Sequence, residues 1–225
     1  MPRTLRADEP GLIYHVLNRG NGRMSLFHKD DDFSAFERVL AEGLERYPVK
    51  LLTYCLMGNH WHLVLQPQQP GAMSRLMGWV GVTHVRRHHE HYHTRGGGHL
   101  YQGRFKSFPI QEDRHLLRVC RYVEANALRA GLVKSAEDWI WSGMHARRHG
   151  KSPLQLAPWP VDRPGNWLAL VNQPLDSDEL EILRKQHVNR GRPFGTDAWT
   201  ASTARRLGLL STVNPVGRPM KKNQS

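Results

Sequence analysis

The feature that most constrains the fold of this chain is a predicted β-hairpin. Residues 50–57 (KLLTYCLM) and residues 60–66 (HWHLVLQ) are short and apolar, and only Gly58 and Asn59 separate them. A two-residue Gly/Asn connection between such runs is a strong signal for two antiparallel strands joined by a tight turn. The fold is therefore expected to be built on an antiparallel sheet.

The remaining elements can be placed around this hairpin. Residues 11–19 (GLIYHVLNR) and 100–110 (LYQGRFKSFPI) are typical of strands. Apolar residues at helical spacing predict helices over 30–47, 72–92 and 112–128, with acidic residues opening the first and the last. The order β-α-β-β-α-β-α predicts an α+β fold, a ferredoxin-like antiparallel sheet with an added helix.

The charge of the chain is high and uneven. The 225 residues carry a net charge of +12, which favours a polyanionic partner, with nucleic acid as the first candidate. Residues 184–225 hold nine Lys/Arg and one acidic residue, Asp197, and so account for +8 of this total. Five prolines lie in the preceding stretch 151–174. We therefore expect a compact domain over residues 1–145, and a linker with a basic, mainly helical extension over 146–225.

Several classes of protein are disfavoured by the sequence. No apolar run reaches the roughly 18–20 residues needed to span a bilayer, and the N-terminus lacks the apolar stretch of a signal peptide. Cys55 and Cys120 are the only cysteines, which excludes a disulfide scaffold and fits a reducing cytoplasm. A cytoplasmic, nucleoid-associated protein is the expectation.

Two histidines on the second hairpin strand form a candidate metal site. Side chains alternate across a strand, so His60 and His62 are expected on one face and Trp61 on the other. Two imidazoles in this arrangement can converge on one ion, although the pair needs a third ligand. A His-x-His pair alone is more typical of ordinary polar residues on a half-exposed sheet.

A second group of histidines is interpreted differently. Its spacing fits no zinc motif and no cysteine accompanies it, which favours a solvated, nucleic-acid-facing or merely polar helix end. The group consists of His84, His88, His89, His91, His93 and His99.

The helix over 112–128 carries a candidate nucleophile. Leu116, Cys120, Val123 and Ala127 recur at core spacing, whereas Tyr122 and Asn126 share another face with His115, Arg118 and Arg129. Tyrosine is a plausible nucleophile where the product stays attached to protein. Its ordinary pKa is about 10, so attack at neutral pH needs a base, a metal or nearby cations. Asn126 could supply a third metal ligand.

The basic C-terminal part is expected to contain helices near residues 177–189 and 197–207 around the turn 191–195. Two short helices around a Gly-rich turn resemble a small, helix-turn-helix-like DNA-binding unit. A second Gly-Arg-Pro sequence at 217–219, followed by Lys221 and Lys222, is expected to form a flexible tail.

Several motifs occur together and in a fixed order. They are Tyr14-His15-Val16 with Asn18-Arg19-Gly20, Met57-Gly58-Asn59-His60-Trp61-His62-Leu63, Gln102-Gly103-Arg104-Phe105-Lys106-Ser107, Tyr122-x-x-x-Asn126 with Arg129-Ala130-Gly131-Leu132-Val133, and Gly191-Arg192-Pro193-x-Gly195. This set resembles the HUH single-tyrosine transposase superfamily, and within it the REP-associated tyrosine transposases. In many insertion-sequence relatives the third ligand is Gln, whereas the REP-associated branch commonly has Asn, so Asn126 supports the resemblance to that branch.

The resemblance implies a function. It implies a metal-dependent, ATP-independent nickase and strand transferase that cleaves single-stranded palindromic (REP) hairpin DNA. His60, His62 and Asn126 would hold Mg²⁺ or Mn²⁺, and Tyr122 would form a 5′-phosphotyrosine link. The REP-associated branch also implies a monomer.

Basic residues on the core and in the extension are reasonable DNA contacts. The candidates are Arg19, Arg104, Lys106, Arg118, Arg129, Arg190, Arg192, Arg205, Arg206 and Arg218.

Two other functions remain open at this point. A protein that keeps the fold and binds a DNA or RNA hairpin without cutting it would not need His60, His62, Tyr122 and Asn126. An HUH relaxase or replication initiator would share the chemistry, but such proteins are usually larger multi-domain chains.

Overall fold

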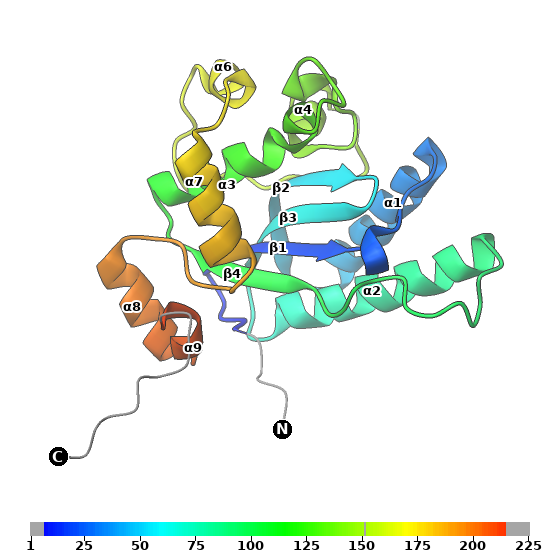
Figure 1. The fold of residues 1–225 in the computed structure, drawn as a ribbon, viewed down its shortest axis with the longest axis horizontal. Coiled ribbons are helices and arrows are strands. Elements are labelled where there is room, and N and C mark those ends of the chain that lie inside the picture. Colours follow the sequence, from blue (N-terminus) through cyan, green and yellow to red (C-terminus); the bar gives the residue numbers. More distant parts are fainter. Residues whose placement is uncertain (1–6, 151, 215–225) are drawn as a thin grey trace.

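The computed structural model describes residues 7–150 and 152–214 and has the predicted α+β architecture (Figure 1). Its sheet has the order β2-β3-β1-β4, and each neighbouring pair is antiparallel. The hairpin β2–β3 therefore lies beside β1, as a ferredoxin-like sheet requires. The strands are β1 (Ile13–Arg19), β2 (Val49–Met57), β3 (His60–Pro67) and β4 (Lys106–Ile110).

Helices pack on both faces of this sheet. The helices of the core are η1 (Asn21–Arg23), α1 (Asp30–Arg46), α2 (Ala72–His91), α3 (Arg114–Glu124), α4 (Asn126–Arg129), η2 (Ala136–Asp138) and α5 (Gly143–His149). The later helices are α6 (Trp167–Asn172), α7 (Ser177–Ile182), the π-helical η3 (Leu183–Val188), α8 (Asp197–Arg206) and α9 (Leu210–Val213). No helix in these described ranges is both long and apolar enough to cross a membrane.

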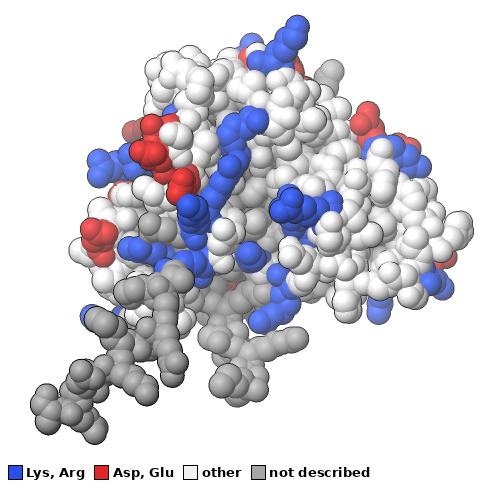
Figure 2. All heavy atoms as spheres, in the orientation of Figure 1, with Lys and Arg blue, Asp and Glu red and all other residues white. Residues whose placement is uncertain are grey.

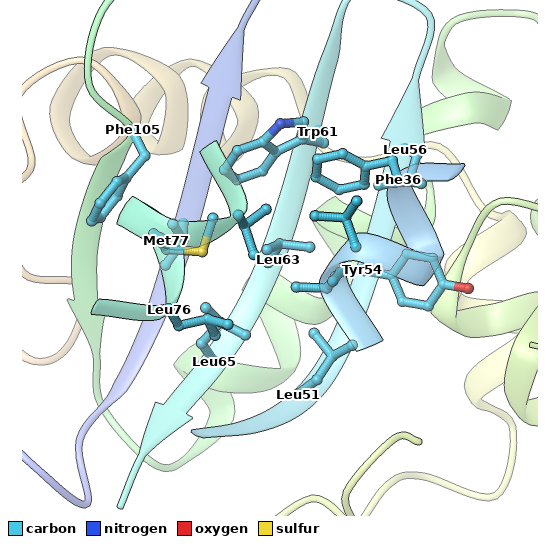
Figure 3. Packing of buried hydrophobic residues seen from close by; sticks show 14 of the residues in the cluster. Phe36, Leu51, Tyr54, Leu56, Trp61, Leu63, Leu65, Leu76, Met77 and Phe105 are labelled. Atoms are coloured by element: carbon cyan, nitrogen blue, oxygen red, sulfur yellow. The ribbon is translucent and has the colours of Figure 1, made fainter. Parts of the chain in front are cut away.

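Strand alternation gives the sheet two separate cores. One face packs against α1 and α2, and Figure 3 shows Trp61, Leu63 and Leu65 of β3 meeting Phe36 and Leu76 there. Trp61 is 1% exposed, and its indole N–H donates to the Tyr101 hydroxyl over 3.1 Å. Full burial of an aromatic side chain of this size contributes about 1.5–3 kcal/mol.

The opposite face of the sheet packs against α3. Val64 and Phe108 from the strands meet Leu116, Cys120 and Val123 of the helix in the second core. The predicted apolar stripe of this helix is therefore confirmed. The helical hydrogen-bonding continues from Arg121 to Ala125, but Ala125 has ψ of 4°, so the predicted helix is divided into α3 and α4 at this residue.

The last strand is shorter than predicted, because only residues 106–110 pair regularly with β1. Before it, Tyr101 makes a single bridge to Gly20, and residues 102–105 leave the ladder. Leu100, Tyr101 and Phe105 are buried in the first core. The apolar pattern that suggested a longer strand thus reflects side-chain packing of an irregular segment.

The C-terminal segment packs against the second core and the β4 edge. Trp167, Val171, Leu183 and Phe194 are buried there. The Phe194 N–H donates to the carbonyl oxygen of Pro109 over 2.8 Å, so the predicted turn at 191–195 lies along β4. Both predicted C-terminal helices are present, the first as α7 continued by η3. The division of the chain into two parts at residues 145/146 stays a prediction, and helix α5 extends across this position.

Candidate active site

His60 and His62 project from β3 toward the α3 side of the sheet, as strand alternation predicts. Their ring centroids are 5.1 Å apart, with the ring planes at 89°. His62 is 3% exposed and His60 is partly exposed, so the pair lies at the edge of the second core. Trp61, between them, points into the first core.

Both imidazoles are held as neutral bases. Burial lowers the pKa of His60 to about 4, and the nearby Arg19 and Arg129 lower it further. Burial, then the neighbouring His15 and His60, hold the pKa of His62 well below its ordinary value. A neutral imidazole keeps a lone pair on one ring nitrogen, which is the form that binds a metal ion.

Tyr122 lies beside this pair. Its ring centroid is 5.7 Å from that of His62, and the two rings meet edge to face at 88°. The sequence pattern placed Tyr122 on a helix face with Arg118 and Arg129, away from the core stripe, but the side chain is only 6% exposed. The pattern could not show this, because α3 is covered by a part of the chain more than 50 residues later.

The cover over Tyr122 comes from the C-terminal segment. Tyr122 and Arg118 of α3 line a small apolar cavity of about 80 Å³. The other lining residues are Leu175, Leu180, Ile182, Leu183 and Phe194. Apolar residues at 180 and 183 have the spacing of one helical face, which is the sequence signal that indicates such a docking surface.

Arg129 connects Tyr122 to Asn126. Its guanidinium carbon lies 4.3 Å from the centroid of the Tyr122 ring. The same guanidinium donates to the backbone oxygen of Tyr122 over 2.8 Å and to Oδ1 of Asn126 over 3.1 Å. Burial lowers the pKa of Arg129 from its ordinary value. One half-buried cation thus joins the candidate nucleophile and the candidate third ligand.

The residues present fit a divalent ion. Within residues 7–150 and 152–214, no group of three or more His, Cys, Asp or Glu side chains could hold a metal. The donor set here is instead two imidazoles and the Asn126 amide, which is 7% exposed. Its Oδ1 accepts from Arg129 over 3.1 Å, and an amide oxygen has a second lone pair that a metal ion could use. Imidazole and amide oxygen are both metal ligands.

His15 is a residue at the site to which the sequence pattern assigned no role. It lies in β1 at 0% exposure, and its Nε2 is 2.8 Å from Nδ1 of His62. Burial lowers its pKa to about 3. The signal in the sequence is a histidine in the apolar run Ile13–Leu17, at a position that alternates onto the same face as His62.

The candidate DNA contacts on the core lie around the site. Arg19 is partly exposed at the end of β1, opposite His60 in the ladder. Lys106 is exposed at the start of β4, whereas Arg104 is exposed in the irregular segment before the strand. Arg118 is exposed at the cavity beside Tyr122. The predicted strand over residues 100–110 would have held both Arg104 and Lys106 on one face, but Arg104 lies outside β4.

The C-terminal candidates have mixed surroundings. Arg190 donates to the backbone oxygens of Ser211 and Asn214, and Arg206 forms an ion pair with Glu9. Arg205 is exposed on α8, and Arg192 is partly exposed. The predicted tail, with Arg218, lies outside the described residues.

His84, one of the second group of histidines, was predicted to be solvated but is buried. His84 is 5% exposed, and its Nδ1 is 2.7 Å from the hydroxyl of Tyr101. Its place in the apolar stripe of α2 explains this burial.

Comparisons with known proteins identify the family of this chain. Residues 9–126 match the family described as Transposase IS200 like. A protein of Haemophilus influenzae, provisionally assigned as a REP-associated tyrosine transposase, is 22% identical over 140 residues, which cover 57% of this chain and 77% of that protein.

One solved structure shares the fold. A REP-associated tyrosine transposase bound to a REP hairpin has a TM-score of 0.52 at 18% identity, covering 72% of this chain and 95% of that one. A structure described as a transposase of Deinococcus radiodurans has a TM-score of 0.40 at 16% identity, covering 55% and 96%. The family match spans more than half of the chain, and the chain therefore belongs to the IS200-like transposase family.

Proposed function

We propose that this protein is a metal-dependent endonuclease and strand transferase for single-stranded, REP-type hairpin DNA. The observation that carries the proposal is the position of Tyr122, 5.7 Å from His62 between ring centroids, with Arg129 over its ring. Membership of the IS200-like family supports transposase chemistry. The substrate class is supported by the likeness to a transposase whose structure was solved with a REP hairpin.

His60, His62 and Asn126 would hold Mg²⁺ or Mn²⁺. A bound divalent ion would polarise a phosphate oxygen and stabilise the charge that develops on the scissile phosphate. The neutral imidazoles and the second lone pair of the Asn126 amide oxygen support this assignment. Their chemistry does not choose between the two ions.

Tyr122 would be the nucleophile. Its hydroxyl oxygen would attack the scissile phosphorus, and the bond from phosphorus to the 3′ oxygen would break. The leaving oxygen takes up a proton and becomes a free 3′-hydroxyl, while the downstream strand stays on Tyr122 as a 5′-phosphotyrosine. Attack by another 3′-hydroxyl on that phosphorus would release Tyr122 and join the strands.

Arg129 would assist this step through its charge. A guanidinium 4.3 Å from the ring centroid would stabilise negative charge that develops during the attack. Arg129 would also hold Tyr122 and Asn126 in position relative to each other, because it donates to the Tyr122 backbone oxygen and to the Asn126 amide oxygen. Preorganised cations of this kind are a large source of stabilisation where charge develops.

The chain would act as a monomer. Tyr122 and His62 lie together within one chain, so the arrangement needs no tyrosine helix from a second copy. The exposed Lys106, Arg104 and Arg118 would contact DNA phosphates near this site. The unit formed by η3, the 191–195 turn and α8 would hold the hairpin.

A labelled hairpin oligonucleotide tests this proposal. Incubation of the full chain with Mg²⁺ or Mn²⁺ should give a protein–DNA adduct that survives denaturant, and Tyr122→Phe should abolish the adduct while hairpin binding persists. Tyr47→Phe, which changes a tyrosine on the α1 side, is the matched control and should cleave normally. Hairpin binding with no cleavage by the unmodified chain would instead indicate a binding protein, and normal cleavage by Tyr122→Phe would refute the mechanism.

A further inference from the structure

A buried histidine on β1 faces the candidate metal site. His15 pairs with Val64 in the ladder, and Val64 is two residues beyond His62 on β3. His15 and His62 are therefore diagonal neighbours on one face of the sheet, within reach of each other. At 0% exposure, His15 is among the most buried polar residues of the described chain.

The two rings are stacked and joined through their nitrogens. Their planes differ by 7°, their centroids are 4.9 Å apart, and Nε2 of His15 is 2.8 Å from Nδ1 of His62. Around them, Phe108 and Tyr122 present ring edges to His15 at centroid distances of 5.0 and 6.1 Å. Nδ1 of His15 has no hydrogen-bond partner within the described residues.

Packing alone does not account for a histidine here. The strand neighbours on this face, Ile13 and Phe108, are apolar and belong to the second core. An unpartnered buried ring nitrogen destabilises the folded chain, and an apolar side chain at position 15 would avoid that cost. What His15 supplies, and an apolar residue could not, is a nitrogen that bonds His62.

The neighbouring histidine has an equivalent partner whose hydrogen-bond direction can be assigned. Nδ1 of His60 is 2.6 Å from Oδ1 of Asn59, and Nδ2 of Asn59 donates to the backbone oxygen of Arg23 over 3.3 Å. The second bond fixes the amide, so its oxygen faces His60 and can only accept. His60 therefore carries its hydrogen on Nδ1 and leaves the lone pair on Nε2.

We propose that His15 and Asn59 are positioning residues that hold His62 and His60 in the Nδ1–H tautomer, so that both present Nε2 to a divalent ion. For His62 this means that Nδ1–H donates to Nε2 of His15. This inference rests on the proposed function, since it takes His60 and His62 as the metal ligands. Partners that fix the tautomer and orientation of a ligating histidine change metal affinity by about 10–100-fold when they are removed.

The tautomers can be measured without metal or DNA. Nitrogen-15 NMR of the full chain at neutral pH distinguishes Nδ1–H from Nε2–H rings, with single substitutions of His60 and His62 assigning the signals. Both rings should be Nδ1–H in the unmodified protein. In His15→Leu, His62 should shift toward Nε2–H while His60 keeps its tautomer. An Nε2–H tautomer of His62 in the unmodified, metal-free chain would overturn the proposal.

Metal affinity provides the second readout. A Mn²⁺ titration followed by electron paramagnetic resonance should show about 10–100-fold weaker binding to His15→Leu. His15→Gln restores a hydrogen-bond acceptor and should recover most of the Mn²⁺ affinity. At position 59, Asn59→Leu should weaken Mn²⁺ binding, whereas Asn59→Asp keeps an acceptor and should retain most of the affinity. His84→Leu removes a buried histidine elsewhere and is the matched control, with unchanged affinity. Equal Mn²⁺ affinity in His15→Leu and the unmodified chain would overturn the proposal.

The two proposals fail differently. If the tautomers and Mn²⁺ affinities behave as described but no covalent DNA adduct forms, the positioning role stands and the proposed function fails. If the adduct forms through Tyr122 while His15→Leu changes neither the His62 tautomer nor the affinity, the function stands and the positioning role is wrong.

Discussion

At the scale of a single residue, the role proposed for Arg129 depends on the geometry of its guanidinium as well as on its charge. Its planar guanidinium lies over Tyr122 while it donates to the Tyr122 backbone oxygen and to Oδ1 of Asn126. A lysine ammonium is a point charge and cannot make these three contacts together. The charge and its geometry are therefore separable by one substitution.

Arg129→Lys should slow adduct formation by about 10²-fold in a single-turnover assay, because a preorganised donor is lost from the site. Arg121→Lys is the matched control, since Arg121 on α3 also donates to backbone oxygens, those of Leu170, Gln173 and Pro174 in and after α6. Arg121→Lys should lower the Tm with little change in rate. Equal rate losses in the two variants would contradict a special role for Arg129.

His84 gives the protein a pH dependence of stability that is independent of the site. Burial lowers its pKa to about 3, and its unfolded value is about 6.5. Between these values the unfolded chain binds the extra proton, so the free energy of unfolding falls as pH falls through this window. The neighbouring charged groups are His88, which lowers this pKa, and Asp32, which raises it.

At pH 5, the lowered pKa of His84 should reduce the free energy of unfolding by about 2 kcal/mol. Between pH 7 and pH 5, the free energy of unfolding should therefore fall by about 2 kcal/mol less in His84→Gln than in the unmodified chain, as measured by denaturant unfolding. His99→Gln, at an exposed position, should keep the original pH dependence. An unchanged pH dependence in His84→Gln would show that His84 is not held neutral.

At the scale of secondary-structure elements, Glu124 joins three of them. Its carboxylate accepts hydrogen bonds from the Thr53 hydroxyl of β2 over 2.7 Å and from the Trp167 indole of α6 over 2.8 Å. Burial raises the pKa of Glu124, and the two hydrogen bonds partly oppose that shift. The carboxyl is thus a buried polar link that holds α3 between the sheet and α6.

Glu124→Gln should change the free energy of unfolding by less than about 1 kcal/mol, because Thr53 can accept from the amide while Trp167 still donates to its oxygen. Glu124→Leu should cost roughly 2–3 kcal/mol, because both partners are left buried and unsatisfied. Equilibrium denaturation of the two variants checks this. Similar stabilities for Gln and Leu at this position would show that the polar link does not matter.

The elements also show what the sequence could and could not predict. The hairpin and helices α1 and α2 were predictable, because local spacing and the Gly58–Asn59 turn determine them. The extent of β4 was not, since Leu100, Tyr101 and Phe105 are apolar for packing on the first core rather than for strand pairing. The cover of Tyr122 and the contact of His15 with His62 depend on docking and strand register, which no local pattern contains.

At the scale of the whole molecule, the net charge of +12 is spread unevenly over the surface. Figure 2 shows Lys and Arg side chains gathered across the middle of one face, over the region of the sheet, with acidic groups toward its margins. Some of the basic residues are partly neutralised, such as Arg206 by Glu9 and Arg87 by Glu42. Exposed cations near the site, such as Lys106, are therefore better candidates for phosphate contacts.

Lys106→Gln should reduce the salt dependence of hairpin binding. Each phosphate contact contributes about 0.7–0.9 to the slope of log affinity against log salt concentration, because binding displaces counterions. Fluorescence anisotropy of a labelled hairpin with the Tyr122→Phe chain measures this slope without cleavage. Arg87→Gln, on the α2 side, should leave the slope unchanged. An equal fall in slope for both variants would indicate diffuse charge rather than a defined contact.

The most direct test of the central claim is the identity of the residue that carries DNA after cleavage. A hairpin labelled at its 3′ end is incubated with the full chain and Mn²⁺, and the adduct is digested with nuclease and trypsin. Trypsin releases residues 122–129 (YVEANALR), in which Tyr122 is the single hydroxyl-bearing side chain. Mass spectrometry should find the 5′-phosphorylated nucleotide on this peptide. A nucleotide on another peptide, or cleavage with no covalent intermediate, would contradict the account.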